Sequence, residues 1–573
     1  MNRLKKTALL TLTGVMLLTG CAESENENDV ATQVSFIGEQ STETATASAA
    51  VSVIADDVFD IVAGIEGWEP FAENVAITIP VYDRHMEDVP DVTDNYWTDW
   101  IQKNFGDPYN ITVTFVGINR TDVLNEYERL VSAGEQPTVF MEYDYPKLAQ
   151  WVNDGYLTTL DMDKFMEVAP DYYQRMVDLG LLPYTSLDGE NYFALAQRPY
   201  YNTDYGYVTV YRKDWLEQIG YDEYPDNWAD EREMLLTLKE SGICQYPCGG
   251  KAIAGSDIDR NYRYRSFPLD EENWACYGDY AIPALGDEAN RKLLQRENEK
   301  YNLGLIEPNY DKIDEETARK NFAVGKCLYY QGYMAPDLDW VNDFYENNPD
   351  GRLAVKITKN VVDREGGTVP ALRANNPFGM MIGFSATASE EQIKAAWMYM
   401  EWLTQEENLF TMQWGIEGEN YKLGQNGLPA QVADYDGACR QGYSNNKDYW
   451  SITIETRDAG SIEDIIAMVA PKNASQDLTS ELIANYYGQL EVADAGYAVS
   501  DCNFAVAFES VSKYQTTLLD LYKEYRNQLT KCDTKRFEAL YDELAERYAE
   551  AGYQEIVDER RTAYLAGQST RLK

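Results

Sequence analysis

The sequence predicts an α/β fold. Between residues 74 and 141, apolar runs rich in β-branched residues alternate with amphipathic helical patterns, in the order strand, helix, strand, helix, strand. The chain has 573 residues, which exceeds one ordinary domain and indicates two or more packed units. The last hundred residues have mainly helical patterns, so we expect extra helices after the α/β part.

The first strand is expected at residues 74–82, where an apolar β-branched run ends at polar residues. The next elements are predicted in this order: a helix over 96–105, a strand over 111–116, a helix over 121–133 and a strand over 138–141. Parallel strands joined by helices bind ligands beyond their carboxyl ends. The residues that follow the first and third strands should therefore line one crevice.

Further elements are expected in the middle and at the end of the chain. Strand patterns cover 189–196 and 207–212, and a short helix over 213–220 ends at a glycine. Helical spacing of apolar residues recurs over 390–403, 518–529 and 537–548. Trp215, Trp228, Trp397 and Trp402 lie on these or neighbouring helices, and we assign them to the core.

Composition excludes several classes of function. Lys and Arg number 49 against 96 Asp and Glu, so the formal charge of −47 would repel nucleic acids and anionic membrane surfaces. Hydrophobic residues make up 44% of the chain, which argues against intrinsic disorder of the whole. The single histidine, His85, excludes multi-histidine zinc sites and leaves any Ser/His/Asp triad dependent on that residue.

The N-terminus has the pattern of a secretory signal. Basic residues precede an apolar stretch, 8–18, that is too short to span a bilayer. The sequence Leu-Thr-Gly-Cys at 18–21 resembles the lipobox of bacterial lipoproteins, which implies cleavage after residue 20 and acylation of Cys21. The alternative is a signal peptide cut nearby with an incidental cysteine. We expect residues 21–72 to form a flexible tether and the protein to be lipid-anchored on the outer face of the cytoplasmic membrane.

The chain has eight cysteines, and without Cys21 an odd number remains, so at least one stays unpaired within a monomer. Cys244 and Cys248 could form a small loop clip, although spacing alone does not settle the pairing. A metal site is the weaker interpretation, because no second close pair and no nearby histidine accompany them. We expect no metal and no cofactor.

Several short segments, in order along the chain, resemble those of extracellular solute-binding lipoproteins that serve ATP-driven importers. The likeness is to the long carbohydrate-type branch of Gram-positive bacteria and covers about residues 74–430. The segments are GEQPT at 134–138, GYL at 155–157, GENYFAL at 189–195, YRKDWL at 211–216, PDNW at 225–228, FAVGKC at 322–327 and GIEGENY at 415–421. Some long members carry a calcium loop after the Pro-x-x-Trp helix, but residues 239–248 here lack its Asp and Asn residues, so no calcium is expected there.

The resemblance implies a two-lobed, hinge-connected (type II) periplasmic-binding-protein-like fold that closes on its ligand. The chain would cross between lobes near 198–201 and return near 378–384. The implied division assigns 1–20 to the signal, 73–197 and 384–430 to lobe 1, and 198–383 and 431–573 to lobe 2. A ligand that touches both lobes stabilises the closed form, and an importer recognises that form. The protein would act as a monomer and would need no covalent chemistry.

Sugar rings stack on aromatic side chains while polar side chains bind their hydroxyls, and the chain has 44 tyrosines. After the first and third strands, the candidate ligand-binding residues are Tyr82, Asp83, Arg84, Tyr143 and Asp144. The resemblance adds Tyr333 as a stacking floor in lobe 2, and the remaining candidates are Arg198, Tyr200, Tyr201, Trp274, Trp414 and Glu417. Each has another interpretation: aromatic residues are more often core, Arg198 could form a hinge salt bridge, and Asp83 could cap a helix.

The predicted function is the capture of a carbohydrate, a neutral oligosaccharide in particular, for delivery to the permease of an ABC importer. A rival class is an exported glycoside hydrolase, which would use two carboxylates that flank the scissile bond. A third interpretation keeps the fold but makes the ligand a peptide, or makes the protein a sensor.

Overall fold

The structure is a computed structural model of the chain. It describes residues 68–83, 91–120, 122–143, 145–198, 207–249, 270–279, 282–333, 339–359, 372–424, 427–432, 447–455, 461–469 and 475–570. The expected signal, Cys21 and most of the expected tether lie outside these residues. The described residues belong to the unit Ile54–Lys573.

The first hydrophobic core gathers two distant parts of the chain, 77–196 and 378–454. Its strands are β1 (Val75–Asp83), β2 (Ile111–Asn119), β3 (Val139–Glu142), β4 (Ser186–Leu187), β5 (Glu190–Asn191), β6 (Ala194–Gln197) and β11 (Phe378–Phe384). Its helices are α1 (Tyr96–Ile101), η2 (Gln102–Gly106), α2 (Asp107–Tyr109), α3 (Val123–Ala133), α4 (Tyr145–Asn153), α5 (Met162–Val168), α6 (Pro170–Asp178), η3 (Leu182–Tyr184), α14 (Glu390–Thr404), α15 (Glu406–Trp414) and α16 (Lys447–Trp450). A hairpin of β12 (Tyr421–Leu423) and β13 (Pro429–Gln431) follows α15.

The strands of this core confirm the predicted alternation. β1 and β2 pair in parallel from Val75 with Ile111 to Asp83 with Asn119, so their carboxyl ends meet at one edge. β3 lies beside β1, where the backbone N–H of Thr78 donates to Thr138 Oγ1 at 3.0 Å. Its ladder partner is β11, an antiparallel strand that the sequence analysis did not anticipate, in the order β3–β11–β6.

Local sequence explains where the helices of the first core begin. Asn95 and Thr98 form a capping box at α1, and Ser389 and Gln392 form another at α14. The helix predicted over 96–105 is present, but its second half is the π-helical η2. Trp397 and Trp402 on α14 are buried, which confirms their assignment to the core.

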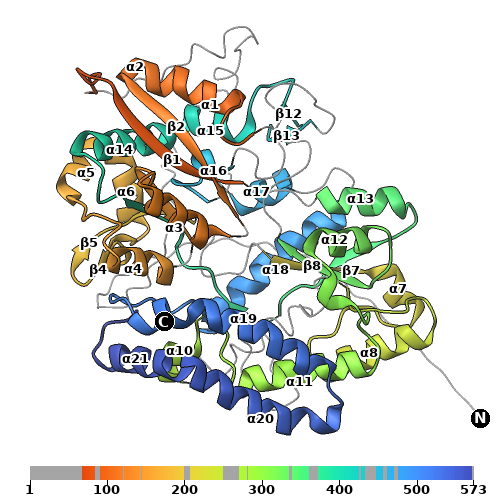
Figure 1. Ribbon diagram of the computed structural model, residues 1–573. Coiled ribbons are helices and arrows are strands. Elements are labelled where there is room, and N and C mark those ends of the chain that lie inside the picture. The colour runs from red at the N-terminus through yellow and green to blue at the C-terminus, as the bar shows by residue number, and fades with distance from the viewer. Residues whose placement is uncertain are drawn as a thin grey trace, which may run out of the picture. The chain divides into compact units, whose positions relative to one another are not determined.

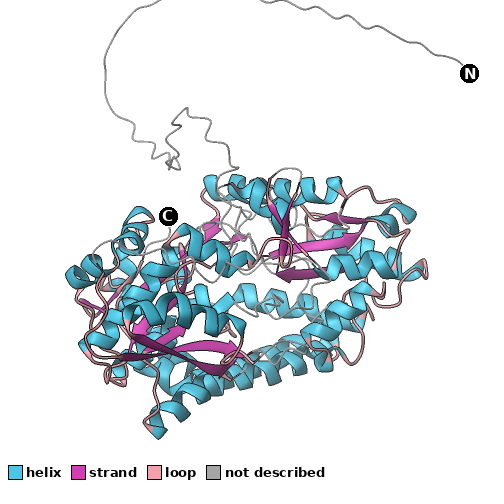
Figure 2. Ribbon diagram, turned by 90° about the horizontal axis from the view of Figure 1, so that it is seen from above, coloured by secondary structure: helices cyan, strands magenta, loops and turns pink. Residues whose placement is uncertain are grey.

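A second set of elements surrounds the antiparallel sheet β8–β7–β9. The strands are β7 (Tyr207–Arg212), β8 (Tyr329–Tyr333) and β9 (Leu353–Val355), and the helices are α7 (Lys213–Gln218), α8 (Trp228–Glu240), η5 (Tyr310–Lys312), α12 (Glu315–Ala323), α13 (Asp339–Asn347), α17 (Ile462–Val469) and α18 (Gln476–Asp494). Val208 and Val210 pack in one core, whereas Tyr211 packs in another. Alternate residues of β7 therefore serve opposite faces of the sheet, and both faces are covered. In Figure 2 the strands form separate small sheets among many helices.

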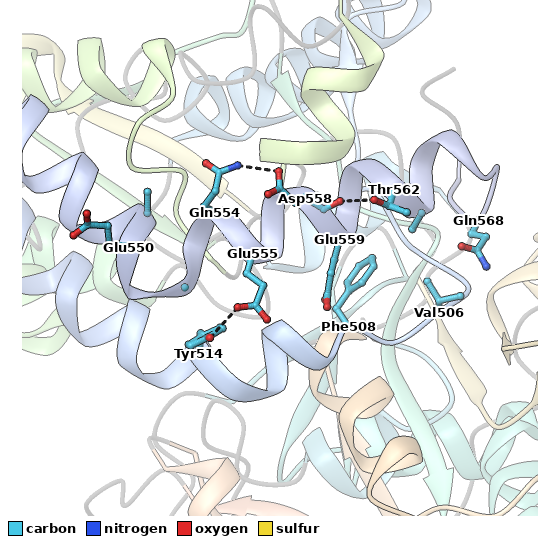
Figure 3. A pocket seen from close by; sticks show the side chains of 13 residues that line it. Val506, Phe508, Tyr514, Glu550, Gln554, Glu555, Asp558, Glu559, Thr562 and Gln568 are labelled. Atoms are coloured by element: carbon cyan, nitrogen blue, oxygen red, sulfur yellow. Dashed lines mark hydrogen bonds between the residues drawn. The ribbon is translucent and has the colours of Figure 1, made fainter.

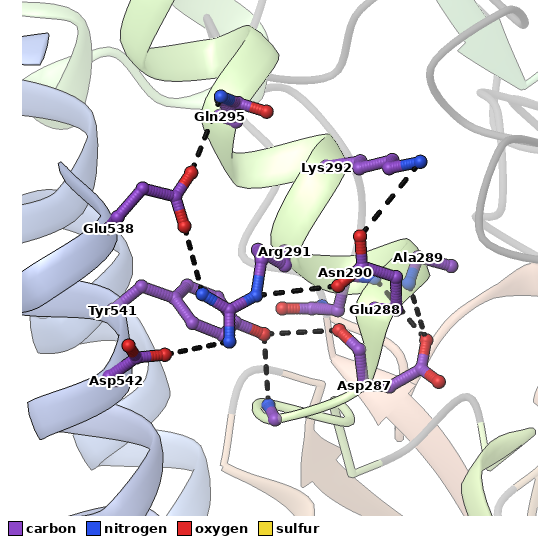
Figure 4. Close-up of polar contacts among 11 residues, drawn as sticks. Asp287, Glu288, Ala289, Asn290, Arg291, Lys292, Gln295, Glu538, Tyr541 and Asp542 are labelled. Atoms are coloured by element: carbon purple, nitrogen blue, oxygen red, sulfur yellow. Dashed lines mark hydrogen bonds and ion pairs between the residues drawn. The ribbon is translucent and has the colours of Figure 1, made fainter.

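The C-terminal part is helical, as the sequence predicts. It comprises β14 (Ala498–Val499), α19 (Glu509–Lys531), η6 (Thr534–Arg536), α20 (Phe537–Tyr548), η7 (Ala549–Tyr553) and α21 (Gln554–Leu565). Three elements from the middle of the chain pack on it: α10 (Glu271–Tyr277), α11 (Glu288–Asn302) and β10 (Leu372–Arg373), which pairs with β14. Helices α20, η7 and α21 follow one another along the chain and lie beside α19, and α11 packs along α19 on another side (Figure 1). Arg291 joins α11 to α20 by ion pairs with Glu538 and Asp542, while its guanidinium lies over the ring of Tyr541 (Figure 4).

In the described part of the chain, three stretches connect the first core with the rest: one after β6, one before β11 and one after Ile454. Phe378–Phe384, where the sequence analysis expected a return crossing, is the buried strand β11 within the first core. The first core also holds residues 449–454, which the expected division assigned to lobe 2. The lobe boundaries as a whole stay a prediction.

Candidate functional site

The carboxyl ends of β1, β2 and β3 bring together aromatic, acidic and basic side chains. Tyr82, one residue before the end of β1, is buried, and its hydroxyl donates toward Met141 O at 3.2 Å and Glu142 Oε2 at 3.4 Å. Its backbone N–H donates to Asp448 Oδ2 at 3.2 Å. Burial, and then the charge of Glu142, raises the pKa of Tyr82, so the phenol stays neutral and can donate.

Arg120 covers the aromatic side of this cluster. It follows β2 directly, and its backbone N–H donates to Asp83 O at 2.9 Å. Its guanidinium carbon lies 4.6 Å from the ring centroid of Tyr82 and 5.8 Å from that of Tyr143, and the two rings are stacked 6.4 Å apart. These contacts are in the range of cation–π attraction. Within the described ranges no carboxylate pairs with this guanidinium.

Two carboxylates behind the cluster are buried. Glu142 is 2% exposed and accepts from the backbone N–H of Tyr143 at 2.7 Å. Asp448 is 3% exposed and comes from α16, more than 360 residues after Tyr82. Because each carboxylate accepts hydrogen bonds from β1 or β3, the pair holds the strand ends in place.

The structure brings three of the predicted residues of this edge together: Tyr82, Asp83 and Tyr143. Arg84 and Asp144 lie outside the described residues. Sequence reasoning missed Arg120, Glu142 and Asp448. The same rule could have found Arg120, because it directly follows the second strand. In the first strand, Asp83 is the last residue and Arg84 is the next one.

The other candidates do not join this cluster in the described part of the chain. Arg198 forms an ion pair with Glu455, and Tyr200 and Tyr201 are outside the described residues. The backbone of Tyr333 ends β8, opposite Tyr207, but its side chain is not described.

Two predicted tryptophans are core residues in this structure. Trp274 is 0% exposed, packs with Val499 and Phe504, and donates its indole N–H to Ser500 O at 2.7 Å. Trp414 is 1% exposed and contacts the ring of Tyr421. Both indole rings are enclosed by protein in this structure, whereas Glu417 is exposed. The large apolar area of the indole explains the burial.

A separate hollow of about 700 Å³ lies among the C-terminal helices (Figure 3). Its apolar lining includes Val506 and Phe508. Three of its four carboxylates accept internal hydrogen bonds: Glu555 from Tyr514, Asp558 from Gln554 and Glu559 from Ser510. None of the predicted ligand-binding residues lines it.

The described residues contain no group of three or more His, Cys, Asp or Glu side chains arranged to hold a metal ion. Cys244 and Cys248 are free thiols there, and burial raises the pKa of Cys244 to about 11. No described helix combines the length and the apolar character that a membrane span requires.

Comparison with known proteins identifies what the chain resembles. Residues 90–409 match the family model described as bacterial extracellular solute-binding protein. No curated protein matches the sequence.

Solved structures share the fold at low sequence identity. The alginate-binding protein AlgQ2, solved without calcium ion, is 13% identical, with 86% of this chain and 98% of the other covered and a TM-score of 0.58. An HMO-binding, ABC-transporter-associated solute-binding protein from Bifidobacterium longum infantis is also 13% identical, with coverages of 86% and 99% and a TM-score of 0.57. The S. pneumoniae ABC-transporter substrate-binding protein FusA, in complex with kestose, is 12% identical, with coverages of 86% and 100% and a TM-score of 0.54. These likenesses show an α/β periplasmic-binding-protein-like fold.

Proposed function

The chain belongs to the family of bacterial extracellular solute-binding proteins, and from this premise we propose that it captures a neutral oligosaccharide and delivers it to an ABC importer. Proteins of this family bind solutes without transforming them, so the chain is a binding protein and not an enzyme. The glycoside hydrolase interpretation is therefore set aside.

The observation that carries the saccharide proposal is the cluster of Arg120, Tyr143 and Asp83 at the carboxyl ends of β1, β2 and β3. These three side chains are partly exposed, whereas Tyr82 is buried behind Arg120. A guanidinium and a carboxylate can bind adjacent sugar hydroxyls, while a tyrosine ring offers an apolar face to the C–H groups of the sugar. The proteins of this fold whose names mention HMO or kestose support the same class of ligand.

The local charge favours a neutral sugar. Among the described residues of this edge, Asp83, Glu142 and Asp448 contribute three carboxylates and Arg120 contributes one guanidinium. An anionic glycan would meet this excess of carboxylates on a chain whose formal charge is −47. A neutral oligosaccharide avoids this repulsion and can still accept from Arg120.

The proposed mechanism is lobe closure. The first core would form one lobe and the sheet β8–β7–β9 with its helices the other, with Tyr333, Tyr200 and Tyr201 as proposed contacts outside the first-lobe cluster. A ligand that contacts both lobes binds the closed form more tightly and shifts the population toward it. Cys21 is proposed to carry the lipid anchor, with 21–72 as the tether between the membrane and the lobes.

The test is a calorimetric screen of neutral oligosaccharides, acidic oligosaccharides and peptides on the chain that lacks residues 1–21. We expect binding of at least one neutral oligosaccharide, with the sugar recovered intact after incubation. Binding of peptides alone, binding of acidic glycans alone, or hydrolysis of the bound sugar would each overturn the proposal.

A further inference from the structure

The three stretches of chain that leave or enter the first core lie side by side. The first leaves β6 at Gln197 and Arg198, the second enters β11 at Phe378, and the third leaves at Ile454 and Glu455. Gln197 pairs with Phe378 on one side and forms a parallel bridge with Ile454 on the other. The three crossings therefore form one small ribbon with the first crossing in the middle.

Backbone hydrogen bonds hold this ribbon together. The N–H of Gln197 donates to Thr453 O at 3.0 Å, and the N–H of Glu455 donates back to Gln197 O at 2.9 Å. On the other side, the N–H of Arg198 donates to Pro377 O at 3.0 Å. Each neighbouring pair of crossings is thus joined by main-chain bonds that any sequence could make.

The side chain of Glu455 adds a bond that depends on sequence. Its carboxylate forms an ion pair with the guanidinium of Arg198, and the two side chains are only 12% and 19% exposed. A Cβ added at Gly379 would lie 2.7 Å from Glu455 Oε2, so the carboxylate rests against the backbone of the second crossing. One carboxylate of the third crossing therefore touches both other crossings.

We infer that Glu455 is a positioning residue that fastens the three crossings into one unit where they leave or enter the first core. This inference rests on the proposed function, because a fastened ribbon matters only if the lobes move. Three crossings that bend independently would let the lobes move in several directions. Crossings that are joined to each other restrict the lobes to fewer directions of movement. Glu455 acts through its contacts with Arg198 and Gly379.

The test uses amide hydrogen exchange of the ligand-free chain that lacks residues 1–21. In Glu455→Gln, amides of residues 195–198, 376–380 and 453–455 should all exchange roughly tenfold faster or more, the factor for one charge-assisted hydrogen bond. The amides of β1 and β2 should keep their rates. The double variant Arg198→Gln, Glu455→Gln should exchange no faster than Glu455→Gln alone, because both changes remove the same ion pair.

The matched control is Glu390→Gln, which removes the exposed ion pair with Lys164 in the first core. It should leave the crossings unchanged. Faster exchange at residues 453–455 alone would overturn the inference, because it would show that the three crossings are not coupled. An equal rise in exchange rate throughout the first core would also overturn it, because it would show only a general loss of stability. If the crossings respond together while no oligosaccharide binds in the calorimetric screen, the proposed ligand fails and the fastening stands.

Discussion

Replacing Tyr541 by phenylalanine removes one oxygen atom from the C-terminal core and leaves the ring. Tyr541 lies on α20 with no exposed surface. Its hydroxyl accepts from the backbone N–H of Gly286 at 3.0 Å and donates to Asp287 O at 3.1 Å (Figure 4). Phenylalanine would keep the apolar packing and the contact with Arg291, so only these two hydrogen bonds are lost.

The expected loss follows from the two backbone groups that remain. A buried polar group without a partner costs about 1–3 kcal/mol. Gly286 is exposed, so water can replace its lost acceptor, and the main cost comes from the carbonyl of Asp287. We therefore expect Tyr541→Phe to lower the local free energy of opening by about 1–2 kcal/mol, which accelerates amide exchange in α20 roughly 5- to 30-fold.

Tyr548 on the same helix is the matched control. It is equally buried, but its hydroxyl has no hydrogen-bond partner in the described part of the chain. Tyr548→Phe removes an unpaired polar atom and should leave the exchange rates of α20 unchanged or lower them. Amide exchange with mass spectrometry measures both variants. Equal acceleration in the two variants, or none in Tyr541→Phe, would refute the reasoning.

Three further predictions concern binding, pH and backbone conformation. Arg120→Gln should weaken binding of an oligosaccharide found in the screen about tenfold in calorimetry, whereas Arg129→Gln on the exposed face of α3 should not change it. Burial raises the pKa of Glu401 above its ordinary 4.5, so the folded state holds this proton more tightly than the unfolded chain does. The stability that protonation of Glu401 contributes is therefore full below pH 4.5 and is lost as the pH rises through the pKa of the folded state. Chemical unfolding should therefore show Glu401→Gln gaining stability relative to the parent as the pH rises above 4.5, and a difference that stays constant with pH would contradict this. Gly552→Ala, at φ +121° and against an aromatic ring of α19, should lower the melting temperature more than Gly567→Ala, whose added methyl meets open space at φ +73°.

Most of the secondary structure could be predicted from the sequence because it is encoded locally. The strand over 74–82 appears as β1 (Val75–Asp83), and the helix over 537–548 appears as α20 with the same limits. Periodic apolar residues and polar end signals lie within these segments, so no distant contact is needed to recognise them. β11 is different, because its place between β3 and β6 depends on pairing with strands about 180 to 240 residues earlier.

The candidate site was predictable to the extent that its residues follow strands. Tyr82, Asp83 and Tyr143 were found by that rule. Arg120 was missed because the apolar run ends at Val116, whereas β2 continues to Asn119 through residues of mixed polarity. Asp448 and Glu455 carry no local signal, since each acquires its role only when the chain returns to the first core.

Aromatic content was a poor guide to which rings are exposed, for a physical reason. The chain has 12 tryptophans and 44 tyrosines, and many of them stabilise its several cores by burying large areas. Trp274 and Trp414 were selected as aromatic residues with polar neighbours, and both are buried. Position at the carboxyl end of a strand distinguished Tyr143 from them, because a strand end is a place where the backbone leaves the core. In a chain this rich in aromatic residues, topology therefore gives better grounds than residue type for choosing which rings can meet a ligand.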